Sequence, residues 1–174
     1  MNLKNIILCG LSIGGLYAAI ASLEEIDVKG LVLINTLRKP SPRLDWKNRA
    51  MVNAAKLGGS ALIMDMGMPV IASPKFLNKV KSNALVFENY KPLDKNDSIF
   101  KLMEGSLSAN WSFDWSKINV PTLIMTGHLD KMFRIPEDIE DLVKKIKNPI
   151  TLEFPSCGHL IPVSYTHLRA HETD

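Results

Sequence analysis

Apolar residues gather in four short runs along the chain, and turns or helical patterns separate them. The runs are Ile6–Cys9, Leu31–Asn35, Val120–Gly127 and Ile150–Phe154. Short, continuously apolar runs are typical of strands buried on both faces of a parallel sheet. A helical pattern follows the first run at Leu16–Leu23. Another begins near Pro136, with acidic residues early and lysines late. This alternation predicts an α/β fold with a mostly parallel sheet flanked by helices.

The middle of the chain, residues 40–117, has a different character. Helical patches at 46–57 and 75–89 are interrupted by glycines and prolines, and five of the eight methionines lie here. Methionine fills irregular cores but also lines adaptable apolar pockets. We therefore expect a helical cap or lid at 40–117, inserted between core portions at 1–39 and 118–163. A simple embellishment on the sheet would explain the methionines equally well.

The first apolar run and the helix after it, Ile6–Leu23, allow two interpretations. Lys4 and the sequence Ala-Ile-Ala-Ser suit an export signal or membrane anchor. However, each glycine in a continuous helix costs about 1 kcal/mol, and a membrane span needs about 20 strongly apolar residues. The favoured interpretation is a strand, a tight turn at Gly10–Gly14 and a helix.

The turn has the pattern Gly-x-Ser-x-Gly, with Ser12 at its centre. A turn this tight between strand and helix forces the serine into a strained backbone conformation and exposes its hydroxyl. The amino terminus of the following helix favours negative charge beside it. Ser12 is therefore a candidate nucleophile, and a plain glycine-rich turn is the alternative.

Three segments together resemble the α/β-hydrolase superfamily. They are Gly-Leu-Ser-Ile-Gly with Ser12, Gly-His-Leu-Asp with Asp130 after the third run, and Cys-Gly-His with His159 after the fourth. Their order (nucleophile, acid, histidine) is the order of that family. The most specific piece is Val120–Asp130, and the resemblance covers Ile6 to about Val163. Within the superfamily, the chain looks most like the capped esterases, lactonases and carbon–carbon-bond hydrolases.

The resemblance implies a role for each residue. His159 would take the proton of Ser12 and later protonate the leaving group, while Asp130 orients the imidazole. The backbone N–H of Ile13 would be one oxyanion donor. Asp130 could instead be a turn aspartate, with Asp45 as the substitute acid, and His159 could be an ordinary loop histidine.

The remaining candidates have simpler interpretations. His128 is expected at a turn or rim, and Cys157 is expected to pack in the interior. No His, Cys or carboxylate spacing indicates a metal site. No cofactor is expected.

Composition narrows the classes of partner. The chain has 174 residues, 46% hydrophobic and 22% charged, which suits a globular domain. A net charge of +3 from dispersed basic residues gives nucleic-acid binding little support. Two separated cysteines, Cys9 in an expected buried strand and Cys157, indicate reduced thiols in a cytoplasmic protein. We expect a small-molecule substrate and no membrane association. The oligomeric state stays open.

Both ends of the chain depart from the resemblance. The family places several strands before the nucleophile, including a loop that donates the second oxyanion N–H. We therefore expect an amino-terminally truncated sequence, with an unpaired apolar edge at Ile6–Cys9. Residues 164–174 look like a non-native tail, so the spacing of His167 and His171 does not indicate a metal site.

The sequence thus predicts a serine hydrolase that cleaves an ester, a lactone or a related acyl bond in a small, fairly apolar substrate. One alternative keeps the fold without turnover, as a non-catalytic ligand-binding protein. Another is an inactive fragment of a hydrolase that is unfolded or depends on a partner. A haloperoxidase-type reaction on the same triad is not separated from ester hydrolysis by the sequence.

Overall fold

The computed structural model describes residues 4–24, 26–36, 41–108 and 110–164. The start of the predicted cap at residue 40 and nearly all of the predicted tail, with His167 and His171, lie outside these ranges. The chain divides into two compact units. We call Met1–Lys39, Val70–Ser73 and Ser112–Asp174 the sheet unit, and Pro40–Pro69 and Pro74–Trp111 the helical unit.

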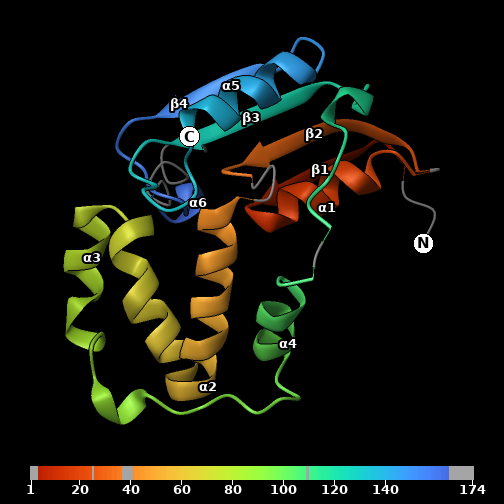
Figure 1. Ribbon diagram of the computed structural model, residues 1–174. Helices are drawn as coiled ribbons and strands as arrows, with labels where there is room; N and C mark the ends of the chain where they lie inside the picture. Colours follow the sequence, from red (N-terminus) through yellow and green to blue (C-terminus); the bar gives the residue numbers. More distant parts are fainter. Residues whose placement is uncertain (1–3, 25, 37–40, 109, 165–174) are drawn as a thin grey trace. The chain divides into compact units, whose positions relative to one another are not determined.

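The sheet unit contains four parallel strands in the order β1-β2-β3-β4 (Figure 1). The strands are β1 (Ile6–Leu11), β2 (Val28–Ile34), β3 (Thr122–Gly127) and β4 (Ile150–Phe154). The predicted α/β fold with a parallel sheet is confirmed. Leu11 pairs in register with Ile34, Ile34 with Met125, and Met125 with Leu152. The segments that follow the four strands therefore all leave the sheet at the edge formed by the carboxyl ends of the strands.

The four apolar runs differ in how deeply they are buried. In the central strands, Leu33 is 0% exposed and Ile124 is 3% exposed. In the part of the sheet that the structure describes, β1 pairs only with β2, Ile7 is 67% exposed and Cys9 is exposed. The expectation that Ile6–Cys9 is buried on both faces is therefore wrong, whereas the unpaired apolar edge expected there is confirmed for the described sheet. An edge strand and a central strand can have the same apolar composition, because burial depends on neighbours far away in the sequence.

Two helices of the sheet unit follow their sequence signals. α1 (Ile13–Ala21) begins directly after the turn at Ser12 and buries Leu16 and Ala19. α5 (Pro136–Lys145) has proline in its first turn and lysines in its last, as the helix dipole favours. A short helix, α6 (Ile161–Ser164), and a 3₁₀ turn, η3 (Trp115–Lys117), complete the unit.

The first apolar stretch is thus a strand and a helix rather than one continuous helix. Within the described ranges, none of the helices combines the length and the apolar character needed to cross a membrane.

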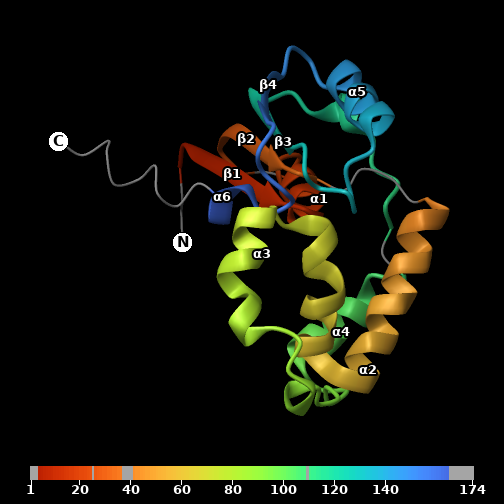
Figure 2. The ribbon, with the colours of Figure 1, turned by 90° about the vertical axis from the view of Figure 1, so that its left-hand side faces the viewer.

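The helical unit is built mainly on α2 (Pro42–Ile71), whose last two residues belong to the sheet unit. Gly59 interrupts it with φ 65° and ψ −154°, and the two segments run in opposite directions (Figures 1 and 2). A Cβ at Gly59 would lie 2.0 Å from the carbonyl oxygen of Lys91. The close approach and the positive φ both require glycine there.

Shorter elements follow α2 in the helical unit. They are α3 (Pro74–Val80), the 3₁₀ turns η1 (Lys81–Asn83) and η2 (Phe87–Asn89), and α4 (Ser98–Gly105). The helical pattern at 75–89 therefore forms a helix only as far as Val80. The α-helix α4 was not predicted.

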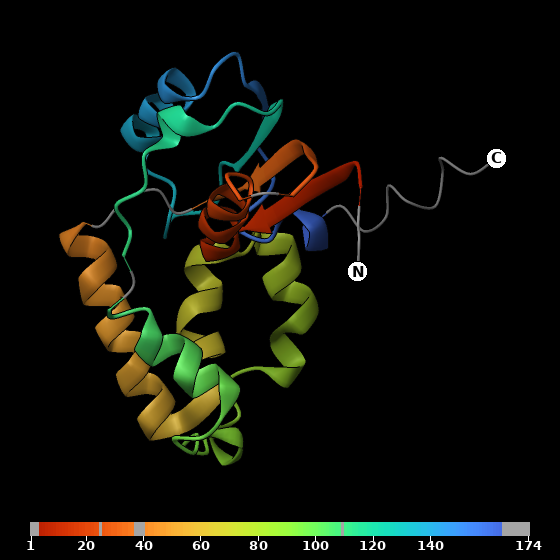
Figure 3. The same ribbon diagram turned by 90° about the vertical axis from the view of Figure 1, so that its right-hand side faces the viewer.

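Polar contacts and ring contacts help to hold the helical unit together. The Asp65 carboxylate accepts hydrogen bonds from the Tyr90 hydroxyl at 2.8 Å and from the Leu85 N–H at 2.9 Å. The bond to Asp65 raises the pKa of the Tyr90 phenol. Figure 3 shows α4 beside the first segment of α2, where buried Phe100 lies 6.0 Å from the Lys56 ammonium.

The predicted methionine-rich region is not simply a core. Met68 is buried, whereas Met64 and Met66 are about half exposed, at 49% and 58%. That the helical unit acts as a cap over a site stays a prediction.

The contact between α1 and the end of β2 gives a first test. A Cβ at Gly15 would lie 2.0 Å from Thr36 Oγ1, whereas a Cβ at Gly14 meets nothing within 4 Å. We expect Gly15→Ala to lower the free energy of unfolding by about 1–3 kcal/mol through overpacking. The matched control Gly14→Ala should leave it unchanged or raise it by up to about 1 kcal/mol. Urea unfolding followed by circular dichroism measures both, and equal effects would contradict the close approach.

Candidate active site

Ser12 occupies a strained turn between β1 and α1. Its φ is 57° and its ψ is −124°, a region that residues other than glycine rarely adopt. Conformations of this kind cost about 1–3 kcal/mol and persist only where the surroundings fix them. Here the Ser12 N–H donates to Ile34 O at 2.9 Å, and the Ser12 carbonyl accepts from the Gly15 N–H at 3.1 Å. The turn is thus held both by β2 and by the first turn of α1.

The turn also depends on how closely its own glycines approach each other. A Cβ at Gly10 would lie 2.3 Å from the carbonyl oxygen of Gly14. Ile13 is the first residue of α1, and the first N–H groups of a helix have no acceptor within the helix. The N–H of Ile13 thus needs no acceptor inside α1, and its role as an oxyanion donor stays a prediction.

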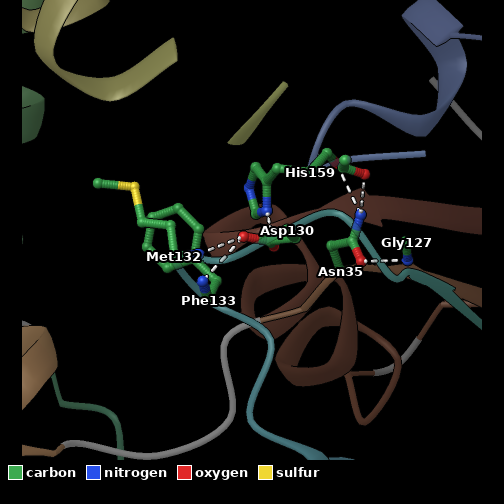
Figure 4. Close-up of polar contacts among 7 residues, drawn as sticks. Asn35, Gly127, Asp130, Met132, Phe133 and His159 are labelled. Atoms are coloured by element: carbon green, nitrogen blue, oxygen red, sulfur yellow. Dashed lines mark hydrogen bonds and ion pairs between the residues drawn. The ribbon is translucent and has the colours of Figure 1, made fainter. Parts of the chain in front are cut away.

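Asp130 and His159 form a buried pair (Figure 4). His159 Nδ1 lies 2.6 Å from Asp130 Oδ2, and the two residues are 5% and 2% exposed. The second carboxylate oxygen, Oδ1, accepts the backbone N–H groups of Met132 at 3.0 Å and Phe133 at 2.9 Å. Both oxygens of Asp130 are therefore engaged, so the carboxylate is fixed in one orientation toward the imidazole.

Further contacts fix His159 itself. Its backbone N–H donates to Ile71 O at 2.6 Å, within the sheet unit. The ring of Phe133 lies 4.5 Å from the imidazole, measured between ring centroids, with a tilt of 41°. Phe133 thus contacts both members of the pair: its backbone N–H donates to Asp130, and its ring packs on the imidazole of His159.

The structure unites the three candidate residues only in part. His159 and Asp130 contact each other directly, and Ser12 lies at the same edge of the sheet, after β1. Among the described residues, no hydrogen bond joins the Ser12 hydroxyl to the imidazole. Such contacts are often long in unliganded enzymes and shorten only when substrate binds.

The substitute candidates lie elsewhere. Asp45 pairs with Arg49 on the exposed surface of α2, in the helical unit. His128 is exposed and pairs with Glu153. Cys157 is buried beside Ile34 and Ile161, as expected of a packing residue. In the ranges that the structure describes, no three His, Cys, Asp or Glu side chains come together as metal ligands would.

Sequence analysis did not single out two residues at this site, Phe133 and Asn35. Asn35 Oδ1 accepts the Gly127 N–H at 2.9 Å, and its Nδ2 donates to His159 O at 2.7 Å and to Gly158 O at 3.3 Å (Figure 4). The available signal was an asparagine directly after the apolar residues Leu31–Ile34. Phe133 gave no comparable signal, because one aromatic residue in a loop is common.

Comparison with solved structures finds the same fold in proteins of low sequence identity. An alpha/beta hydrolase enzyme from a Medee basin deep-sea metagenome library superposes with a TM-score of 0.76 at 23% identity, over 95% of this chain and 63% of its own. A thermophilic esterase from Thermogutta terrifontis gives 0.72 at 23% identity, over 95% and 62%. The enol-lactonase from Burkholderia xenovorans LB400 gives 0.70 at 17% identity, over 96% and 64%.

The chain therefore spans slightly less than two thirds of the length of these structures. No curated protein matches it significantly. The family described as alpha/beta hydrolase fold, in contrast, matches residues 1–164. Since this match includes the whole described sheet together with Ser12, Asp130 and His159, the chain belongs to the alpha/beta hydrolase fold family.

Proposed function

We propose that this chain carries the catalytic residues of a serine hydrolase that cleaves an ester, a lactone or a related acyl bond in a small, fairly apolar substrate. The observation that carries the proposal is the buried pair of His159 and Asp130, joined at 2.6 Å. It lies at the sheet edge that also holds the strained Ser12. A serine, a base and a group that orients the base are the parts that nucleophilic catalysis needs.

The first half of the reaction transfers the acyl group to Ser12. When the proton of the imidazole lies on Nδ1 and is donated to Asp130, Nε2 keeps a lone pair. Nε2 takes the proton of the Ser12 hydroxyl while Oγ attacks the carbonyl carbon of the substrate. The tetrahedral intermediate collapses, and the leaving alkoxide receives the proton from Nε2. The result is an ester between the acyl group and Ser12.

The second half transfers the acyl group to water. Nε2 takes a proton from a water molecule whose oxygen attacks the acyl carbon. The bond to Ser12 Oγ then breaks, Oγ regains a proton from Nε2, and the carboxylic acid leaves. Asp130 stabilises the imidazolium that forms in each half, because its carboxylate faces Nδ1.

Negative charge develops on the substrate oxygen in both halves. The N–H of Ile13 opens α1, so the positive end of the helix dipole adds to this donor. The second oxyanion donor is not assigned to any residue of this chain.

The proposed substrate class is supported by two proteins of similar structure. Two of the similar structures are an esterase and an enol-lactonase, at 23% and 17% identity. Both act on an acyl–oxygen bond. This chain spans only 62% and 64% of their lengths. The activity of the whole protein is therefore proposed here and is not shown by the likeness.

A serine-directed fluorophosphonate tests the nucleophile. We expect the native chain to form one adduct, on Ser12, located by tandem mass spectrometry, and we expect heat denaturation to abolish it. Ser12→Ala should remove both the adduct and the hydrolysis of p-nitrophenyl acetate. The control Ser22→Ala should change neither, since Ser22 Oγ donates to Ala19 O at the end of α1, away from the turn of Ser12.

The result separates the proposal from its rivals. A cooperatively folded chain without an adduct contradicts the assigned nucleophile. Saturable binding of small esters without turnover in such a chain would favour a ligand-binding protein.

The acid is tested by replacing a carboxylate with an amide. In Asp130→Asn the amide oxygen can still accept the N–H groups of Met132 and Phe133, but an NH₂ group then faces His159. The imidazole must accept at Nδ1 and hold its proton on Nε2, where it cannot take the proton of Ser12. We expect kcat for ester hydrolysis to fall on the order of 10⁴-fold.

Asp45→Asn is the matched control, because that carboxylate pairs with Arg49 on an exposed surface. Its kcat should equal that of the unchanged chain. Loss of activity in Asp45→Asn, with activity kept in Asp130→Asn, would reverse the assignment of the acid.

A further inference from the structure

We infer that Asn35 is a positioning residue of this site, whose side-chain amide holds the His159 loop in register with the strand that leads to Asp130. The inference rests on the proposed function. It adds a residue that contacts none of the reacting atoms.

The amide of Asn35 joins two segments that are far apart in sequence. Its Oδ1 accepts the N–H of Gly127, the last residue of β3 and three positions before Asp130. Its Nδ2 donates to the carbonyl oxygen of His159 at 2.7 Å and to that of Gly158 at 3.3 Å. One planar group thus forms hydrogen bonds with the end of β3, which leads to Asp130, and with the backbone of His159 (Figure 4).

The nucleophile is connected to the same point. Ile34, which precedes Asn35, accepts the backbone N–H of Ser12 at 2.9 Å. The backbone N–H of Asn35 itself donates to Met125 O on β3 at 2.9 Å. Two consecutive residues at the end of β2 therefore contact the segments that carry all three proposed catalytic residues.

Other hydrogen bonds support part of this arrangement. The N–H of Leu129 donates to Cys157 O at 2.8 Å, which ties the acid segment directly to the histidine segment. Asn35 adds a tie from both segments to β2. Because the neighbouring Ile34 accepts the backbone N–H of Ser12, Asn35 also connects both segments to the turn of Ser12.

The position demands an asparagine for chemical reasons. A short amide side chain offers an acceptor and two donor hydrogens in one rigid plane. Asn35 is 8% exposed, so partners left without it would be unsatisfied in the interior. Its φ of 42° is also a left-handed value that asparagine tolerates better than most residues.

Positioning of this kind acts on catalysis through geometry. A displacement of about 1 Å in a catalytic group can cost about 100-fold in rate. A shift of the His159 backbone would lengthen or tilt the hydrogen bond from Nδ1 to Asp130. It would also move Nε2 relative to Ser12.

The test compares two substitutions. Asn35→Asp keeps the size of the side chain and the acceptor for Gly127, but it places a second oxygen against two carbonyl oxygens. Asn35→Ala removes all three hydrogen bonds. For p-nitrophenyl acetate we expect kcat to fall about 10–100-fold in both variants, with KM changed less than about threefold. The control Asn48→Ala should change neither, because Asn48 donates to Ser106 O within the helical unit.

A second readout does not depend on turnover. A proton held between Nδ1 and a buried carboxylate resonates far downfield in the proton NMR spectrum, and Asp130→Asn assigns this resonance by removing it. We expect the resonance to shift or broaden in both Asn35 variants and to stay unchanged in Asn48→Ala. A solely structural role would lower the melting temperature and leave the resonance and kcat of the folded fraction unchanged. That result would overturn the inference.

The outcomes also separate this inference from the proposed function. If Ser12→Ala is as active as the unchanged chain, the function fails, while the NMR comparison still decides the role of Asn35. If Asn35→Ala does not fold, Asn35→Asp carries the test. Rapid hydrogen exchange of the Asn35 side-chain amide in the unchanged chain would overturn the inference without any substitution.

Discussion

The parallel pairing of β2 with β1 and β3 is the constraint on which the rest of the site depends. Because all strands point the same way, the chain leaves each of them at one edge of the sheet. The in-register pairs Leu11–Ile34 and Ile34–Met125 set the spacing of these exits. The proposed nucleophile Ser12 and the distant pair of Asp130 and His159 can meet there only if this register holds.

Two local features at this edge of the sheet are energetically unfavourable. Ser12 takes a backbone conformation that L-residues disfavour, and Asp130 carries a carboxylate into the interior. Burying a carboxylate costs several kcal/mol, which only well-placed hydrogen bonds can offset. Three N–H donors, from Met132, Phe133 and His159, surround that carboxylate. Proteins keep such locally unfavourable choices where function depends on them.

Much of this was accessible from the sequence, and the failures have a common cause. The strand positions and the pairing of Asp130 with His159 followed from short apolar runs and the order of three motifs. The exposure of Ile7 and Cys9 did not follow from their apolar run, because an edge strand is defined by the neighbour it lacks; only the resemblance to the family, with its order of strands, indicated an unpaired edge there. The role of Asn35 depends on partners 92 to 124 positions away, which no local pattern contains.

The geometry also shows why the motif residues alone do not make the site. A Cβ at Gly14, the second glycine of Gly-x-Ser-x-Gly, would meet open space, whereas a Cβ at Gly15, outside the motif, would collide with Thr36. Ser12 is held by a carbonyl of β2, and His159 by a carbonyl of Ile71 and the amide of Asn35. The proposed catalytic residues are thus placed by backbone carbonyls and one side-chain amide of other segments. A chain could keep all three motifs and still lose the site if the end of β2 moved.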